Sequence, residues 1–390
     1  MTFLHGIKVN EPLDGARPIL EKSSAVIGLV AIAADADADA FPLNKPVLLT
    51  DVQAAIAKAG VAGTLAKSLT EIANQGSPLT IVVRVAPGVA GDGLTQAEAT
   101  EANVIGTAAG GSYTGLQALL AAEVQLKVKP RILGAPGLTS QAVVDALGIA
   151  AGKLNGFAYP ACAGALDVTD AVAYRCEFGA REIMLIWPDF VGGAGGTWSG
   201  KAEAIALGLR AALDERVGWH KSLSNVVIAG VTGISKDVHF DLQDMSTDAG
   251  VLNEGDVTTL VHMQGYRFWG NRTCSDEPLF AFEVAVRTGQ AIKDAIADGL
   301  VWAIDKPMTR GLVTDIVETI NKKFRQWKAE GRIIGATCWY DPASNDDTNL
   351  AAGRLVLDYD YTPCAPLEGL ILNQRITSKY YQGFGDTIAA

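Results

Sequence analysis

The chain has 390 residues, of which 49% are hydrophobic and 19% charged, and its formal net charge is −11. This acidic composition argues against general nucleic-acid binding, because such binding depends on Lys and Arg that neutralise phosphates. No apolar run reaches the roughly 18 residues of a membrane span, and the first residues lack a basic segment followed by an apolar run, so we expect neither membrane insertion nor a signal peptide.

The sparse charge indicates an oligomer, because a subunit that buries several faces against its own copies needs fewer charged side chains. The length predicts two or three domains. Five scattered cysteines form no CxxC pair, which is typical of reduced packing cysteines in a protein made in a cytoplasm: Cys162, Cys176, Cys274, Cys338 and Cys364.

The first segment, residues 1–25, contains one strand-like stretch at 6–10, in which Ile7 and Val9 share a face. Pro12, Gly15 and Pro18 interrupt the residues after this stretch. A single strand is not stable alone in water. We therefore expect this arm either to join a distant part of its own fold or to donate a strand to a neighbouring subunit.

Residues 26–100 are predicted to form a small α/β unit. Strands are expected at 25–33, 47–50 and 79–85, and helices at 51–59 and 64–74. The segment 87–115 is rich in Gly, Ala and Thr, with a helix expected at 96–105, and it is interpreted as a boundary or a surface excursion.

Residues 101–264 continue the alternation on a larger scale. Helices are expected at 115–123, 140–154, 167–178 and 201–216, and each precedes an apolar strand, at 131–135, 156–160, 182–187 and 224–229. Strands that are apolar throughout favour a parallel sheet covered on both faces by helices.

The third region, residues 265–368, is predicted to be α+β. It begins with the densest aromatic stretch of the chain, 265–273, in which Tyr266, Phe268 and Trp269 are expected to pack a core. Helices follow at 280–297 and 309–330, then strands at 335–340 and 354–362. The last segment, 369–390, carries one more strand at 370–376 that could pair with another subunit, through Leu370, Leu372, Gln374 and Ile376.

Two local patterns raise an enzyme hypothesis. Residues 195–201 fit GxxxxGK before a helix, as in a nucleotide-binding loop, but Ala202 stands where Ser or Thr would bind magnesium. His220, Ser222 and Ser224 lie close in sequence, yet a hydrolase also needs an acid behind the histidine. We interpret both as loop and turn structure, and keep an α/β hydrolase or nucleotide-binding enzyme as the alternative function.

Four dispersed histidines, His5, His220, His239 and His262, form no metal motif, so we expect no metal and no cofactor.

The helix at 309–330 has a basic face. Val313, Ile316, Ile320, Phe324 and Trp327 form an apolar stripe, and the basic residues outside it are Lys322, Lys323, Arg325 and Lys328. This face is either a solvated surface favoured by the helix dipole or a docking surface for an acidic partner.

Several segments together resemble the tail sheath proteins of contractile bacteriophages, which are also found in R-type pyocins. The resemblance is carried in order along nearly the whole chain by residues 35–38, 41–48, 129–134, 186–190, 218–221, 230–235, 265–276 and 358–363. It is weakest at 87–115 and 191–200.

The resemblance implies an outer subtilisin-like α/β domain without protease activity and an inner, tube-facing domain built from the C-terminal third. It implies that the terminal arms exchange strands between subunits, through Ile7 and Val9 at one end and 370–376 at the other. It also implies that the inner-domain helix with Lys322, Lys323, Arg325 and Lys328 contacts the tail tube, and it assigns Tyr266, Phe268 and Trp269 to the inner core.

The function so implied is mechanical. Subunits would stack as six-fold rings around the tube and contract to drive it through a bacterial envelope during genome ejection. The expected partners are other copies of the chain, the tube protein, and the baseplate and tail terminator proteins. The expected location is the virion tail, after assembly in the host cytoplasm.

Overall fold

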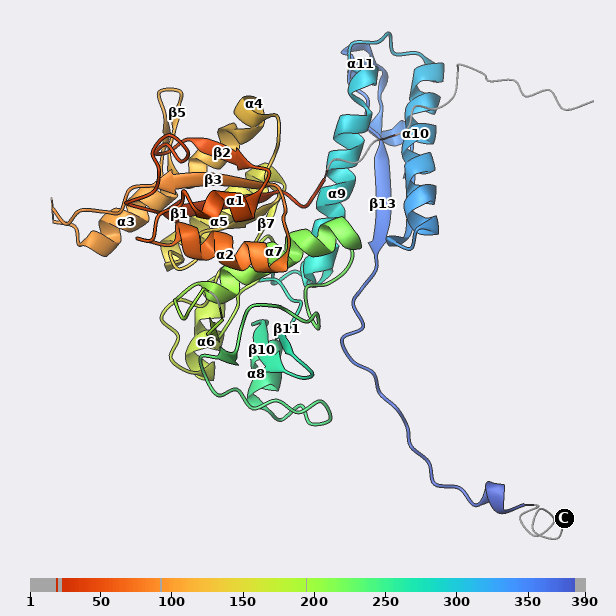
Figure 1. Ribbon diagram of the computed structural model, residues 1–390. Coiled ribbons are helices and arrows are strands. Elements are labelled where there is room, and N and C mark those ends of the chain that lie inside the picture. The colour runs from red at the N-terminus through yellow and green to blue at the C-terminus, as the bar shows by residue number, and fades with distance from the viewer. Residues whose placement is uncertain (1–18, 20–22, 92, 194, 383–390) are drawn as a thin grey trace, which may run out of the picture.

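The structure is a computed structural model that describes residue 19 and residues 23–91, 93–193 and 195–382. The chain forms an α/β body, a smaller α+β unit to which the last helices and strands belong, and an extended C-terminal arm (Figure 1). The predicted strand at 6–10, with Ile7 and Val9, lies outside the described residues. Within the described part, no helix is long and apolar enough to cross a membrane.

A five-stranded sheet forms the centre of the α/β body. Its order is β2 (Pro46–Leu49), β3 (Thr80–Val85), β1 (Ile27–Ile32), β6 (Ile132–Gly134) and β7 (Phe157–Ala158). All neighbours are parallel except β2, which runs antiparallel to β3. Along β1, Ile27 and Leu29 enter the core on one face and Val30 enters the core on the other. The strand is apolar throughout because both faces are buried.

This sheet corrects the predicted boundary between residues 100 and 101. Ile27 of β1 pairs with Thr80 of β3 on one side and with Ile132 of β6 on the other. The two segments predicted as separate α/β units therefore share one sheet. The segment 87–115 between β3 and β6 is a surface excursion and not a boundary: it contains the helix α3 (Gln96–Ile105) and the short hairpin β4 (Ala108–Ala109) to β5 (Ser112–Tyr113).

Helices cover both faces of the sheet (Figure 1). On one face lie α1 (Val52–Ile56), α2 (Leu65–Gln75) and α7 (Lys201–Arg216); on the other lie η1 (Gly115–Ala121), α4 (Ala122–Leu126) and α5 (Gln141–Leu154). Nearly every residue of α7 is buried, because the helix packs against both α2 and the strands β6 and β1. Gly208 permits this approach: a Cβ there would lie 2.9 Å from the Cα of Ile72.

Beyond β7 the α/β body becomes irregular. Its elements are α6 (Val168–Arg175), β8 (Phe190–Val191), β9 (Gly233–Ile234), α8 (Asp248–Glu254), β10 (Thr259–His262) and β11 (Tyr266–Trp269). The predicted strand at 182–187 is a buried extended segment that makes isolated bridges, from Ile183 to Ala158 and from Ile186 to Ala161 and Thr258. The predicted strand at 224–229 likewise makes one isolated bridge, between Val227 and Arg267.

The aromatic stretch belongs to the α/β body, and its assignment to the core of the C-terminal domain is wrong. Phe268 is fully buried and its ring lies 5.4 Å from that of Phe190, in the main core of the body. Tyr266 packs against the same core, and the Trp269 ring lies 5.1 Å from that of Phe240. The physical reason is strand pairing: β11 forms a hairpin with β10 across the predicted boundary between 264 and 265.

The C-terminal unit has its own core. Its elements are η2 (Pro278–Phe280), α9 (Glu283–Gly299), η3 (Val301–Ala303), α10 (Arg310–Ala329), β12 (Ile333–Trp339), η4 (Pro342–Ser344), α11 (Asp347–Ala351) and β13 (Asp358–Pro363). The antiparallel pair β12–β13 packs with α9 and α10 around Trp327, Phe324 and Ile292. Ile19, near the start of the chain, lies in this core.

A polar face of α9 joins the two parts of the molecule. At helical spacing, Glu283, Arg287, Gln290 and Asp294 all contact the α/β body. The Glu283 carboxylate accepts a hydrogen bond from the Tyr159 hydroxyl at 2.5 Å and lies 3.2 Å from Arg210. Arg287 pairs with Asp214, which also bonds Arg210 at 2.7 Å. Gln290 donates to the carbonyl of Gly156 at 2.6 Å, and Asp294 pairs with Arg131 at 2.5 Å.

Candidate functional site

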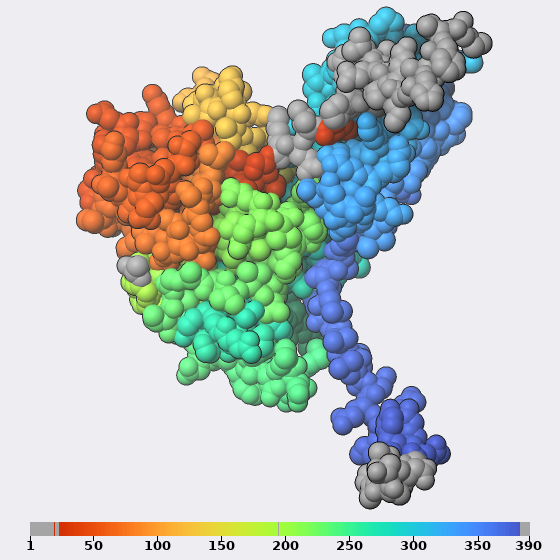
Figure 2. Space-filling model, turned by 45° about the vertical axis from the view of Figure 1, so that its right-hand side comes forward, coloured from red at the N-terminus to blue at the C-terminus, as the bar shows by residue number. Residues whose placement is uncertain are grey.

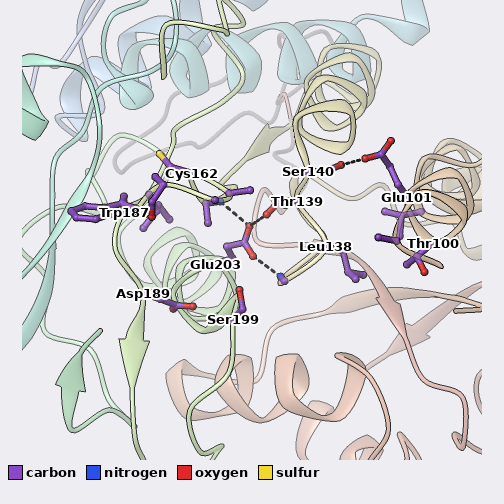
Figure 3. Close-up of a pocket in the computed structure, with 18 of the residues that line it drawn as sticks. Thr100, Glu101, Leu138, Thr139, Ser140, Cys162, Trp187, Asp189, Ser199 and Glu203 are labelled. Carbon is purple, nitrogen blue, oxygen red and sulfur yellow. Dashed lines mark hydrogen bonds between the residues drawn. The ribbon is translucent and has the colours of Figure 1, made fainter. Parts of the chain in front are cut away.

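A cleft of about 1020 Å³ lies at the carboxyl edge of the parallel sheet. It is bordered by α3, by the loops that follow β6 and β7, and by the start of α7 (Figure 3). Open α/β sheets bind their ligands at this edge, so the cleft is where an enzyme site would be expected. Its acidic residues include Glu101, Asp189 and Glu203, and its other polar residues include Thr139, Ser140 and Ser199.

Glu203 lies at the floor of the cleft and is fully engaged with its own chain (Figure 3). Its carboxylate accepts hydrogen bonds from the backbone of Gly137 at 2.6 Å, the hydroxyl of Thr139 at 2.6 Å and the backbone of Ala161 at 2.8 Å. Burial raises the pKa of Glu203 to about 7, against the lowering effect of these donors. Glu203 therefore ties α7 to the loops after β6 and β7.

The other two acids also stabilise the fold. The N-cap of α7 is Gly200, which has no side chain to bind the exposed backbone donors of the first turn. Asp189 takes this role and accepts from Gly200 at 2.8 Å and from Ala202 at 2.6 Å. Glu101 accepts a hydrogen bond from the hydroxyl of Ser140, the N-cap of α5. The three acids therefore hold loops and helix ends in place.

The loop at 195–201 does not present its lysine to a phosphate. The side chain of Lys201 is completely buried and pairs with Glu71 of α2, whose side chain is also completely buried. The ammonium group is turned into the core between α2 and α7. A nucleotide-binding lysine must instead reach the phosphates held by its loop.

The serine hydroxyls near His220 bind backbone amides. Ser222 accepts a hydrogen bond from the backbone of Ser224 at 3.1 Å, and Ser224 accepts one from the backbone of Gly270 at 3.1 Å. The His220 ring stacks edge-on against Trp219. In the described chain, no serine hydroxyl is hydrogen-bonded to His220, and no three His, Cys, Asp or Glu side chains gather as a metal site.

The basic face of α10 is smaller than predicted. Lys322, Arg325 and Lys328 are exposed, and Arg325 lies 3.4 Å from Glu318 on the same helix. Lys323, by contrast, is buried: its ammonium lies 5.2 Å from the ring centre of Trp327. Its place on the predicted contact face is therefore wrong, because its side chain turns onto the apolar stripe.

The C-terminal arm leaves the body as a narrow extension (Figure 2). Residues 370–376, predicted as a strand, have no regular secondary structure in the isolated chain. Four large apolar side chains in this segment are 70–100% exposed: Leu370, Ile371, Leu372 and Ile376. Gln374 is exposed too. A contiguous exposed apolar segment is typical of a surface that another chain covers.

Family models cover most of the chain. Residues 24–85 match the model described as "Tail sheath protein Gp18 domain III N-terminal region", residues 111–274 match "Phage tail sheath protein central domain", and residues 275–377 match "Phage tail sheath C-terminal domain". The division between the last two falls after the β10–β11 hairpin, which agrees with the position of that hairpin in the α/β body.

Similar proteins span the full chain. The tail sheath protein of Escherichia phage P2 is 52% identical over 382 residues, with 97% of this chain and 96% of that protein covered. The major tail sheath protein of Serratia phage KSP20 is 45% identical, with 97% of each covered.

Solved structures agree in fold. The sheath complex of the extracellular contractile injection system PVC, in its contracted state, has a TM-score of 0.72 at 15% identity, with 98% of this chain and 99% of that chain covered. The contracted helical sheath of the anti-feeding prophage has a TM-score of 0.69 at 16% identity, with 97% and 100% covered.

Proposed function

Because this chain belongs to the phage tail sheath protein family, we propose that it stacks as six-membered rings around a tail tube and contracts to drive that tube through a bacterial envelope. Its relatives are structural proteins of virion tails, and it is a structural protein rather than an enzyme. Assembly takes place in the host cytoplasm in this proposal. The α/β body would be the outer, subtilisin-like part without protease activity, which the internally bonded acids of its cleft support.

The observation that carries the proposal is the exposed apolar arm. Residues 370–376 can be stabilised as a strand when they add to the sheet of another copy, where backbone hydrogen bonds and apolar contacts replace water. The two-stranded sheet β12–β13 is a suitable acceptor, because in the described chain each strand pairs with the other alone. The N-terminal strand with Ile7 and Val9 would supply a second donor.

The acceptor sheet has unequal edges. Asn321 of α10 donates to the carbonyl of Cys338 and accepts from its amide, both at 2.8 Å. Since the amide and the carbonyl of Cys338 both bond to Asn321, these backbone groups face the outer edge of β12. An incoming strand would therefore pair with β12 ahead of Cys338, or with the outer edge of β13.

Contact with the tube would come from the exposed basic side chains Lys322, Arg325 and Lys328. Ion pairs at an exposed surface contribute about 0–1 kcal/mol each. Several such pairs can hold a sheath on an acidic tube and still be broken when the sheath expands. Baseplate and terminator proteins would bind the two ends of the polymer.

The test is polymerisation of the purified chain, followed by negative-stain electron microscopy and sedimentation. We expect striated hollow cylinders. A chain that ends at Glu368 should remain folded by circular dichroism but fail to form cylinders. Cylinders of normal length and abundance from this shortened chain would refute strand donation by the C-terminal arm.

A further inference from the structure

Among the described residues, one ion pair joins the C-terminal arm to the α/β body. Five residues after β13 ends, the carboxylate of Glu368 accepts two hydrogen bonds from the guanidinium of Arg272, from Nε at 2.9 Å and from Nη2 at 2.8 Å. Arg272 lies between β11 and α9, 96 residues earlier in the chain. The pair has the two-pronged geometry that gives an arginine–carboxylate contact a defined direction.

Arg272 is held in position by further contacts. Its guanidinium carbon lies 5.3 Å from the ring centre of Phe282, and its Nη1 lies 3.7 Å from Asp256. Its backbone forms a bridge with that of Phe282. The arginine is therefore oriented before the arm binds, and less conformational entropy is lost when Glu368 docks.

Beyond Glu368 the arm loses contact with the body. From Gly369 to Ile376, no hydrogen bond joins the arm to the rest of the described chain, and the large apolar side chains are exposed. The side chains of the pair are themselves 38% and 41% exposed. Such a pair adds little to global stability, so its main effect is on the geometry of the arm.

We propose that the Arg272–Glu368 pair is a clamp that sets where the arm leaves the body, and so which neighbouring copy the arm reaches. This inference rests on the proposed strand donation. With the clamp closed, the free arm begins at Gly369. With the clamp open, the last contact is the one between the Cys364 Sγ and the carbonyl oxygen of Gly331 at 3.5 Å, so the free arm begins at Ala365, which adds four residues and about 13 Å of free chain. A longer free tether lowers the effective concentration of the strand at its acceptor.

The experiment uses the full chain with Arg272→Glu, with Glu368→Arg, and with both changes together. Each single change puts like charges at the clamp, and we expect it to raise the critical concentration for polymerisation several-fold. The double change re-forms an ion pair and should bring the critical concentration most of the way back to that of the unmodified chain.

Controls separate the clamp from the arm. Lys58→Glu, an exposed charge reversal on the α/β body, should polymerise as the unmodified chain does. If both single variants polymerise normally while the chain ending at Glu368 does not, the clamp is refuted and strand donation stands. If the double variant is no better than the singles, the clamp is also refuted. If the shortened chain polymerises normally, strand donation itself is refuted.

Discussion

At the scale of residues, buried and half-buried charges in this protein bind groups of their own chain. Glu203, Asp189 and Glu101 each accept hydrogen bonds from the ends of helices or from loops. Lys201 and Glu71 satisfy one another in the core. A buried charge that lacks such a partner costs several kcal/mol, which explains why these groups occur in pairs and networks. The same engagement leaves them unable to act on a substrate.

The Lys201–Glu71 pair can be tested directly. Lys201→Met leaves Glu71 buried without its cation and should lower the free energy of unfolding by about 3–5 kcal/mol. Urea denaturation followed by circular dichroism measures this change. The double variant Lys201→Met with Glu71→Leu removes both charges and should recover most of the stability. A neutral effect of the single change would contradict the buried pair.

Glu203 should make stability depend on pH. Its pKa is raised from 4.5 to about 7 in the folded protein, so between these values the folded state binds more protons than the unfolded state. The contribution of Glu203 to the free energy of unfolding is therefore greatest below pH 4.5, falls as the pH rises to about 7, and is constant above that.

The check compares Glu203→Gln with the unmodified chain by urea denaturation across this pH range. The amide side chain leaves one backbone donor without an acceptor, so the variant should be less stable by about 1–3 kcal/mol at high pH. Since it does not titrate, the stability difference should widen as the pH falls towards 4.5. A difference that is independent of pH would refute the raised pKa.

At the scale of elements, the sequence predicts the helices and strands whose hydrophobic periodicity comes from burial against their own chain. The helix bounds 96–105 and 201–216 agree with α3, which starts with a Thr95–Glu98 capping box, and with α7, which follows Gly200 and ends at Arg216. The segment 182–187 is predicted to be a regular strand, yet in the structure it pairs with neighbouring segments through isolated bridges at Ile183 and Ile186. Periodicity predicts that Lys323 flanks the basic face of its helix, yet its side chain packs on the Trp327 ring, one turn further along the same helix.

The exposed basic face of α10 gives a prediction at this scale. Reversal of Lys322, Arg325 and Lys328 to Glu should abolish assembly on an acidic tube, because attraction becomes repulsion, while polymerisation without a tube continues. Lys323 is kept, since its side chain belongs to the core. Electron microscopy of the purified variant, with and without tube protein, measures both activities.

The matched control reverses three exposed lysines of the α/β body, Lys58, Lys127 and Lys153, which changes the net charge by the same amount. This control should assemble on the tube normally. If the α10 variant also assembles normally, α10 does not dock the tube. If both variants fail, net charge rather than this face is responsible.

At the scale of the whole molecule, the connection between its two parts was not predictable from the sequence. Glu283, Arg287, Gln290 and Asp294 look like the solvated face of an amphipathic helix, because nothing in the local pattern indicates that the α/β body covers them. The predicted domain boundary between 264 and 265 is wrong for a related reason: β10, the strand that pairs with the aromatic stretch, lies before this boundary in the chain. Sheet pairing and domain contacts depend on distant residues, whereas periodicity reports local burial.

The polar contacts between α9 and the α/β body predict that the α/β body and the C-terminal unit unfold cooperatively. Arg287→Met leaves Asp214 and Glu283 buried with Arg210 as their one shared cation, and should lower the free energy of unfolding by about 3–5 kcal/mol. Because the lost contacts lie between the α/β body and the C-terminal unit, we expect hydrogen exchange of β12 and β13 to become faster than that of β1 and β3. In the unmodified chain we expect the two groups of strands to be protected together.

The variant Asp214→Asn with Arg287→Met is charge-balanced, because Arg210 and Glu283 remain as one base and one acid. It should recover a large part of the lost free energy of unfolding and of the cooperativity between the two parts. If hydrogen exchange in Arg287→Met is equally fast in β12 and β13 and in β1 and β3, apolar contacts hold the two parts of the molecule together. One such contact is the packing of Trp219 against Trp327, whose ring centres lie 5.5 Å apart. In that case Trp219→Ala, and not a change in the charge network, should separate the two parts.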